Sequence, residues 1–190
     1  SDLPSRSVGI HTNILALRYD IGSDEQLERT LAYVEQRLAH NVDIGVEQDQ
    51  GSGYAELYFM FYTLEALYRH GRADLAEQAI RDHYGLLVEH GATTLWECFA
   101  RGVRDRGSFC HAWGGAPLIM AVRHVLGIHP ADPADRDRVR IAPQAAGITR
   151  ARGTFPHERG PITVSWDRRG DRIDLTANAP AGVKLDTPGA

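Results

Sequence analysis

The chain has 190 residues, of which 43% are hydrophobic and 24% are charged, and this balance excludes a disordered chain. Its formal net charge is -4, with acidic and basic residues interleaved, which argues against a nucleic acid partner. No apolar run approaches the roughly 18 to 20 residues that span a bilayer, and the first residues lack the order of a signal peptide. We therefore expect a folded protein without a membrane partner, and its two cysteines favour the cytoplasm.

The first part of the chain has helical periodicity. A first helix is expected over residues 8–17, and a second helix begins with Asp24 as its N-cap. The apolar residues of the second helix recur at three- and four-residue steps until the chain breaks at His40 and Asn41. The apolar stripes of the two helices are Ile10, Ile14 and Leu17, and Leu27, Leu31, Val34 and Leu38.

Three more helices are expected, over residues 54–70, 73–89 and 117–126. The first of these is apolar on nearly every side, so we expect it to be buried on most faces. The link between the first two is short, and short links join antiparallel helical hairpins. Each of the three helices is followed by a glycine that suits a left-handed C-terminal cap: Gly71, Gly91 and Gly127.

After Pro130 the pattern changes to short runs in which apolar and polar residues alternate between turn residues. Such runs predict the antiparallel strands of a small β-sandwich. The stretch 129–137, which has two prolines and four charges, is the expected boundary. We thus predict a mainly α part, residues 1–128, followed by an all-β domain, residues 129–190. The expected strands cover residues 138–141, 147–155, 161–166, 172–177 and 183–185.

Two of the three tryptophans bracket a charged loop, residues 101–106, and each lies near a glutamate or a histidine. The residues are Trp96 and Glu97 before the loop and His111 and Trp113 after it. Indole faces stack on the apolar face of a sugar ring, while a carboxylate and an imidazole bind hydroxyls or transfer protons. This pattern predicts a carbohydrate site. The alternative is that both tryptophans fill the core and Glu97 accepts a hydrogen bond from a backbone amide.

Other polar residues carry weaker signals. A metal site would combine Cys98, Cys110 and His111 with a later histidine, but their spacing matches no paired cysteine or histidine motif. We therefore expect no metal and no other cofactor. His11 and Asn13, near the start of the first helix, are interpreted either as polar packing or as pocket lining.

These residues carry a resemblance to a known family. The stretches "VGIHTNILAL" (8–17), "GATTLWE" (91–97) and "SFCHAWGGAPLIM" (108–120), in this order, resemble the C-terminal part of bacterial α-L-rhamnosidases of glycoside hydrolase family 78. These enzymes are six-hairpin glycosidases, and the resemblance spans about residues 8–185. It implies that the helices form a partial (α/α)6 toroid of antiparallel helical hairpins, and that the strands form the small antiparallel β-sandwich that follows it.

The resemblance also implies a reaction and roles for single residues. The family inverts the anomeric centre as it releases α-L-rhamnose from a rhamnose-containing glycoside or polysaccharide. Glu97 matches the general base, His111 matches a histidine that contacts rhamnose, and Trp96 and Trp113 would help to wall the pocket. The family's general acid lies in an acidic motif in the earlier half of the toroid, to which this sequence has no match.

The number of expected helices is less than half of that in a complete toroid. We therefore expect the chain to be a piece of a longer enzyme that is inactive alone, since a base without its acid supports little turnover. An incomplete toroid exposes apolar surface along its open side. We expect the missing N-terminal part of the enzyme, or a second copy of the chain, to cover that side.

Two other functions remain open from the sequence. A polysaccharide lyase would keep the helical toroid and use Tyr54 or His111 to abstract a proton beside a uronate, with Arg101, Arg104 and Arg106 binding its carboxylate. The second alternative is a non-catalytic carbohydrate-binding or scaffold module.

Overall fold

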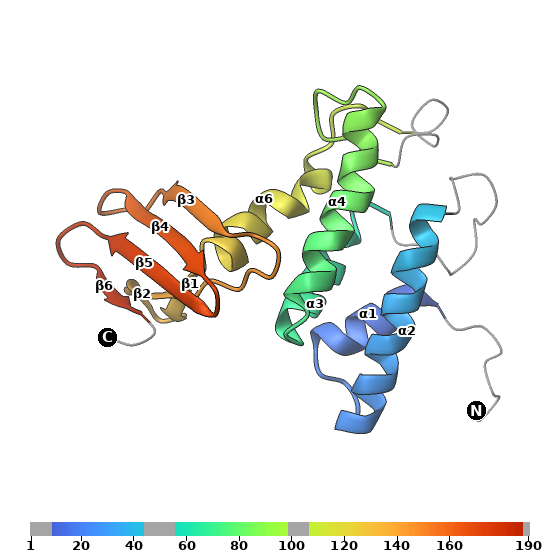
Figure 1. Ribbon diagram of the computed structural model, residues 1–190, viewed down its shortest axis with the longest axis horizontal. Helices are drawn as coiled ribbons and strands as arrows, with labels where there is room; N and C mark the ends of the chain where they lie inside the picture. Colours follow the sequence, from blue (N-terminus) through green and yellow to red (C-terminus); the bar gives the residue numbers. More distant parts are fainter. Residues whose placement is uncertain (1–8, 44–55, 99–106, 188–190) are drawn as a thin grey trace. The chain divides into compact units, whose positions relative to one another are not determined.

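A computed structural model covers the 190 residues and describes residues 9–43, 56–98 and 107–187 (Figure 1). The chain divides into two compact units, Ser1–Pro117 and Leu118–Ala190. The first unit is helical and the second contains the strands. This arrangement confirms the predicted fold class of a helical part followed by a β-rich part. None of the described helices is long and apolar enough to cross a membrane.

The first two helices are α1 (Ile10–Arg18) and α2 (Asp24–Asp43). The predicted stripe of α1 is confirmed, because Ile10, Ile14 and Leu17 are fully buried. The N-cap of α2 is Ser23 rather than Asp24, so that prediction is wrong. The Gln26 backbone N–H donates to Ser23 Oγ at 3.4 Å and the Ser23 N–H donates to Gln26 Oε1 at 2.8 Å, which is a reciprocal capping box. α2 also continues to Asp43, past the predicted break.

The next two helices, α3 (Met60–Arg69) and α4 (Ala73–Glu89), form the predicted antiparallel hairpin. Gly71 at their junction has a φ of +71°, so it takes the left-handed cap that only glycine adopts without strain. α4 has its predicted bounds. α3 begins later than predicted, because residues 57–59 form a turn; the first two residues of the predicted helix, 54 and 55, lie outside the described residues.

Ion pairs join the helices of this unit across long stretches of sequence. Arg69 of α3 donates two hydrogen bonds to the Asp20 carboxylate in the link after α1, and this contact lowers the pKa of Asp20. Arg72, at the start of α4, lies 3.2 Å from a Glu35 oxygen on α2. These pairs join α3 to the link after α1 and the start of α4 to α2, while most residues of α3 are buried.

A short helical region leads into the β unit. It consists of a 3-10 turn (Ala112–Gly115), α6 (Ala116–Met120) and the π-helical turn η2 (Ala121–Val125). The predicted helix 117–126 is thus confirmed, although its last turn is π-helical. Gly127 ends it with a φ of +77°, and a side chain there would collide with the backbone of Ala142 and Pro143.

The strands form two three-stranded sheets, in the orders β1-β2-β6 and β3-β4-β5 (Figure 1). The stretch 129–137, which the sequence offered as the boundary, contains most of β1 and the start of β2, and these two strands form a hairpin that was not expected from the sequence. Pro130 is accommodated because β1 is an edge strand, where its missing N–H is not needed for a ladder. The pair β2 and β6 is parallel, and the other pairs are antiparallel. The strands are β1 (Ile128–Asp132), β2 (Asp135–Ile141), β3 (Arg150–Phe155), β4 (Ile162–Arg169), β5 (Arg172–Asn178) and β6 (Lys184–Asp186).

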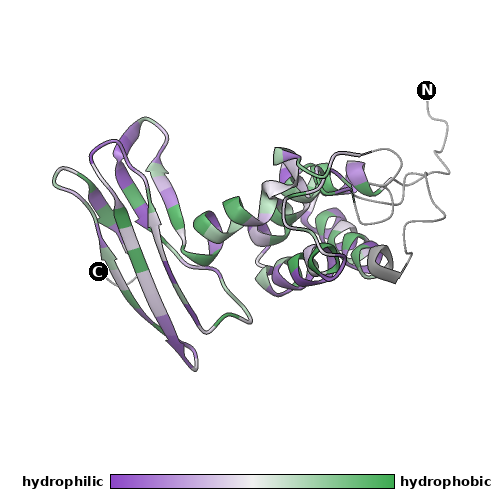
Figure 2. Ribbon diagram, turned by 90° about the horizontal axis from the view of Figure 1, so that it is seen from above, coloured by the Kyte–Doolittle hydropathy of each residue, from purple (hydrophilic) through white to green (hydrophobic). Residues whose placement is uncertain are grey.

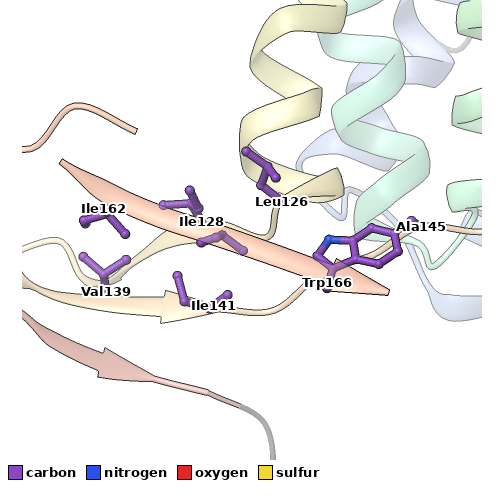
Figure 3. Packing of buried hydrophobic residues seen from close by; sticks show 8 residues of the cluster. Leu126, Ile128, Val139, Ile141, Ala145, Ile162 and Trp166 are labelled. Atoms are coloured by element: carbon purple, nitrogen blue, oxygen red, sulfur yellow. The ribbon is translucent and has the colours of Figure 1, made fainter. Parts of the chain in front are cut away.

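The core of the β unit lies between the two sheets and the end of the helical region (Figure 3). Trp166 of β4 is almost fully buried there, and its indole N–H donates to the Val125 carbonyl at 2.8 Å. Gly153 of β3 lets Leu126 approach, since a Cβ at that position would lie 2.4 Å from Leu126 Cδ1. Hydrophobic and hydrophilic residues alternate along the strands, as expected for sheets with one buried face (Figure 2).

Candidate active site

Two segments that follow α4 lie side by side within the helical unit. The Glu97 backbone N–H donates to the Ser108 carbonyl at 2.9 Å, and the His111 N–H donates to the Leu95 carbonyl at 2.7 Å. The Thr94 hydroxyl also donates to the carbonyl of Phe109. These bonds bring the predicted residues before and after the charged loop together, while residues 99–106 of that loop lie outside the described residues.

Close backbone packing at Gly114 fixes the relation between the two segments. A Cβ at Gly114 would lie 2.7 Å from the Trp96 carbonyl oxygen, closer than real Cβ atoms come. The neighbouring Gly115 has room, because its Cβ would lie 3.5 Å from Leu95 Cδ1. Only the first of the two glycines is therefore required by the packing.

We expect Gly114→Ala to destabilise the chain by about 1 to 3 kcal/mol, because the new methyl group forces the Trp96 carbonyl away. Urea unfolding of the 190-residue chain, followed by circular dichroism, measures this cost. Gly115→Ala is the matched control and should change the free energy of unfolding by far less. Equal losses for the two variants would contradict the packing role of Gly114.

The carboxylate of Glu97 is held on one side. The Ser108 backbone N–H donates to Glu97 Oε2 at 2.8 Å, and His111 Nδ1 lies 3.9 Å from the same oxygen. Within the described residues, Oε1 has no hydrogen-bond partner. The side chains of Glu97 and His111 are 40% and 29% exposed. Glu97 thus accepts a hydrogen bond from a backbone amide, and its side chain stays partly exposed.

The two tryptophans have different surroundings. Trp113 is 63% exposed, and its ring centroid lies 5.4 Å from that of His111, with the rings perpendicular at 89°. Trp96 is only 7% exposed and packs edge to face against Phe109 at 5.0 Å. The structure therefore places the exposed Trp113 against His111, and it buries Trp96.

Tyr58, which the sequence did not indicate as a site residue, extends the aromatic surface. Its ring centroid lies 4.7 Å from that of Trp113 at an angle of 35°, and it is 44% exposed. The Tyr62 ring lies 6.0 Å away, and a hydrogen bond to Tyr58 raises the pKa of Tyr62. Tyr58 lies in a run of apolar residues, so its sequence context predicts a buried side chain and gives no sign that it belongs to an exposed aromatic surface.

Asn13 and His11 of α1 are interpreted from the sequence either as polar packing or as pocket lining, and the structure gives them different surroundings. Asn13 Nδ2 donates to the Gly9 carbonyl at 2.8 Å, which is a local contact at the start of the helix. The His11 ring packs edge to face against Phe59 at 4.3 Å, and burial lowers its pKa. Phe59 in turn contacts Tyr58, so His11 borders the aromatic surface.

The cysteines differ in environment and are both free. Burial raises the pKa of the Cys98 thiol, and the negative charges of Glu56 and Glu97 act in the same direction. A raised pKa keeps the thiol protonated and disfavours a thiolate nucleophile or metal ligand. Across residues 9–43, 56–98 and 107–187, no three His, Cys, Asp or Glu side chains cluster to hold a metal ion.

Two family models match almost the entire chain. The model described as the bacterial alpha-L-rhamnosidase 6 hairpin glycosidase domain matches residues 6–125. The chain belongs to the bacterial α-L-rhamnosidase family. A second model of that family, the bacterial alpha-L-rhamnosidase C-terminal domain, matches residues 127–187. The predicted resemblance is confirmed over both parts.

Several relatives agree with this assignment. An α-L-rhamnosidase of Streptomyces avermitilis is 29% identical and covers 61% of this chain. A family 78 rhamnosidase of Bacillus sp. GL1 is similar in structure, with a TM-score of 0.75, 26% identity and 97% of this chain covered. The α-L-rhamnosidase of Streptomyces avermitilis in complex with L-rhamnose has the same fold, with a TM-score of 0.69, 22% identity and 94% of this chain covered.

The chain spans only a small part of these relatives. It covers 12% of the curated rhamnosidase sequence, and 19% and 18% of the two rhamnosidase structures. It is thus similar to one portion of rhamnosidases, a set of helical hairpins and the β-rich region next to it. Membership in a glycosidase family favours hydrolysis over the lyase alternative, whose Tyr54, Arg101, Arg104 and Arg106 lie outside the described residues.

Proposed function

We propose that this chain forms the C-terminal part of the catalytic toroid, up to residue 128, and the following β-sandwich, residues 129–190, of an inverting α-L-rhamnosidase. One observation carries the proposal. One oxygen of the Glu97 carboxylate is held by the Ser108 amide and lies 3.9 Å from His111 Nδ1, the other has no hydrogen-bond partner within the described residues, and His111 in turn contacts the exposed Trp113. A fixed carboxylate with one open oxygen next to an aromatic surface suits a base that acts on water beside a sugar.

In the proposed reaction Glu97 is the general base. Its Oε1 accepts a proton from a water molecule while the water oxygen forms a bond to the anomeric carbon. The bond from that carbon to the glycosidic oxygen breaks on the opposite face, and a carboxylic acid gives its proton to the departing oxygen. Inversion needs the two carboxyl groups roughly 6.5 to 9.5 Å apart, so that the water fits between them. We propose that the rest of the enzyme supplies the acid.

The neighbours of Glu97 have separate roles in this proposal. The Ser108 amide fixes the direction of the carboxylate through Oε2. His111 donates a hydrogen bond to a rhamnose hydroxyl, and Trp113 with Tyr58 covers the apolar face and methyl group of this 6-deoxy sugar. Trp96 supports the wall of the pocket without contacting the sugar, because its side chain is buried and its backbone packs against Gly114.

The helical unit has apolar surface that a partner would cover. Its exposed large apolar side chains include Tyr19, Ile21 and Val88. Such surface on a helical layer is typical of an interface. We propose that the earlier helices of the enzyme cover it, with a second copy of the chain as the alternative. The two free cysteines support the cytoplasm as the place of action, since free thiols persist in a reducing compartment.

An activity assay on the whole enzyme and on the 190-residue chain tests the proposed function. We expect the enzyme that contains this chain to release β-L-rhamnose first from an aryl α-L-rhamnoside, as seen by proton NMR during the first minutes. We expect the chain alone to be slower by about 10²-fold or more, because it lacks the acid. Release of the α-anomer first would contradict inversion, and an unsaturated product that absorbs in the ultraviolet would contradict hydrolysis.

The second test concerns His111. In the whole enzyme, we expect His111→Ala to raise the KM for the rhamnoside by about tenfold, because one hydrogen bond to the sugar is lost. Steady-state kinetics separates this effect from a change in kcat. His90→Ala is the control, since His90 is exposed and its ring Nδ1 lies 2.9 Å from the Leu86 carbonyl oxygen within the same helical turn. An unchanged KM in the His111 variant would overturn the assignment of this residue.

A further inference from the structure

One face of the sheet β3-β4-β5 is polar throughout. The residues that point toward the core alternate with a second set that points away from it, as the register of the three strands requires. We call this second set the outer face. Its charged members are Arg150, Arg152, Asp167, Arg169, Arg172 and Asp174, and its hydroxyl and amide members are Thr154, Thr163, Ser165, Thr176 and Asn178.

The outer face is cationic, although the chain as a whole is acidic. Four arginines stand against two aspartates on this face, whereas the chain has a formal net charge of -4. Asp174 is neutralised locally, because its carboxylate lies 3.3 Å from Arg169 Nε and 2.8 Å from Arg172 Nε. Arg169 and Arg172 are thus engaged with Asp174, whereas the other two arginines of the face have no ion pair among the described residues.

Arg150 and Arg152 are available to a ligand. Both are exposed, and neither has an ion pair or hydrogen bond within the described residues. Arg150 lies opposite Asp167 in the register, yet the two do not form an ion pair. As alternate residues of one strand, the two arginines lie side by side at a separation of about 7 Å. Each guanidinium can bind a carboxylate through two parallel hydrogen bonds.

The two arginines border a hollow in the outer face. The hollow has a volume of about 680 Å³, and its lining includes Arg150 and Arg152 together with Thr163, Ser165, Thr176 and Asn178. Hydroxyl and amide groups both donate and accept hydrogen bonds, which matches the vicinal hydroxyls of a sugar. Asp167 borders the same hollow and can accept hydrogen bonds from hydroxyls.

The composition of the hollow favours an acidic sugar over a nucleic acid. No aromatic side chain occupies the outer positions of the three strands, so there is no platform on which bases stack. Asp167 accepts hydrogen bonds, which the hydroxyls of a sugar ring donate and the phosphate groups of a DNA backbone do not. We propose that the outer face of β3-β4-β5 binds a polysaccharide that carries uronic acid residues, with Arg150 and Arg152 on a carboxylate and the hydroxyl side chains on the sugar rings. This site is separate from Glu97, so its test does not depend on the proposed reaction.

Affinity electrophoresis and calorimetry with polygalacturonate test the proposal on the 190-residue chain. We expect polygalacturonate to retard the chain, and dextran, a neutral polymer, to leave it unaffected. The double variant Arg150→Ala/Arg152→Ala should bind polygalacturonate at least about tenfold more weakly, since charged hydrogen bonds are lost. Circular dichroism checks that the variant is folded, which we expect because both side chains are exposed.

The matched control is Arg138→Ala/Arg140→Ala. This pair has the same spacing on β2 of the other sheet and removes the same charge, and it also breaks the ion pair between Arg138 and Asp186. Binding that survives in this control and is lost in the first variant supports the site. An equal loss in both variants would show a non-specific charge effect and overturn the proposal. Binding of wild-type strength in the Arg150→Ala/Arg152→Ala variant would overturn it as well. The two arginines would then serve to protect the edge strand β3 from pairing with other chains. Equally tight binding of a single-stranded oligothymidylate would also overturn the choice of an acidic sugar.

Discussion

Replacement of Glu97 by glutamine in the whole enzyme is expected to lower kcat by about 10² to 10⁴-fold, the range that general base catalysis contributes. The amide has nearly the same size as the carboxylate but cannot accept the proton of the attacking water. The Ser108 N–H can still donate to the amide oxygen, so the segments around residues 94–97 and 108–111 should keep their positions. The KM should change little in comparison.

Steady-state kinetics with an aryl α-L-rhamnoside measures the effect, and circular dichroism establishes that the variant is folded. Glu89→Gln is the matched control, because this substitution makes the same chemical change at an exposed position at the end of α4. That control should keep the wild-type rate. A Glu97→Gln enzyme with a wild-type rate would rule out Glu97 as the base and leave its carboxylate with a packing role only.

Trp166→Ala is expected to have the largest effect on stability. Trp166 is 1% exposed in the core of the β unit, so its loss removes a large apolar contact and leaves a cavity. The Val125 carbonyl also loses the indole N–H as its donor. A buried tryptophan replaced by alanine costs about 3 to 5 kcal/mol of unfolding free energy.

Urea unfolding of the chain, followed by far-ultraviolet circular dichroism, measures this loss. Trp166→Phe separates the two causes, because it keeps most of the apolar volume but lacks the N–H donor. We expect that variant to lose about 1 to 3 kcal/mol, the cost of a part-buried carbonyl that loses its donor. A loss below about 1 kcal/mol in the alanine variant would mean that Trp166 does not organise this core.

The helical elements were predictable where one periodic signal dominates. Ile10, Ile14 and Leu17 are a stripe that only a helix buries together, and all three are buried. The cap of α2 was assigned one residue too late, because Asp24 and Ser23 are both good caps by type. The deciding feature is the pairing with Gln26, since a residue three positions after Ser23 completes the capping box.

The missed strand β1 shows the limit of local signals. Pro130 and the charges after it are typical of a linker, and nothing nearby indicates a partner. The strand exists because β2 pairs with it and because, at an edge, the proline N–H is not required. The parallel pairing of β6 with β2 joins residues more than 40 positions apart, which no short-range pattern encodes.

The candidate site was predictable in part. Glu97 and His111 were expected together from residue type and resemblance, and their side chains do meet. The two tryptophans could not be distinguished, since burial depends on tertiary packing that the residue type does not specify. Tyr58 was missed because an apolar neighbourhood predicts a buried side chain, whereas the turn at residues 57–59 leaves it partly exposed.

The paired hydrogen bonds between Glu97 and Ser108 have a consequence for how such a site evolves. Together with the bond from the His111 N–H to the Leu95 carbonyl, they anchor Glu97 and His111 from either side of 99–106, so the sequence of that segment does not have to specify their positions. Selection can then alter the length and charge of that segment without moving the proposed base. In the proposed enzyme, preference for one glycoside over another can diversify while Glu97 and His111 stay in place.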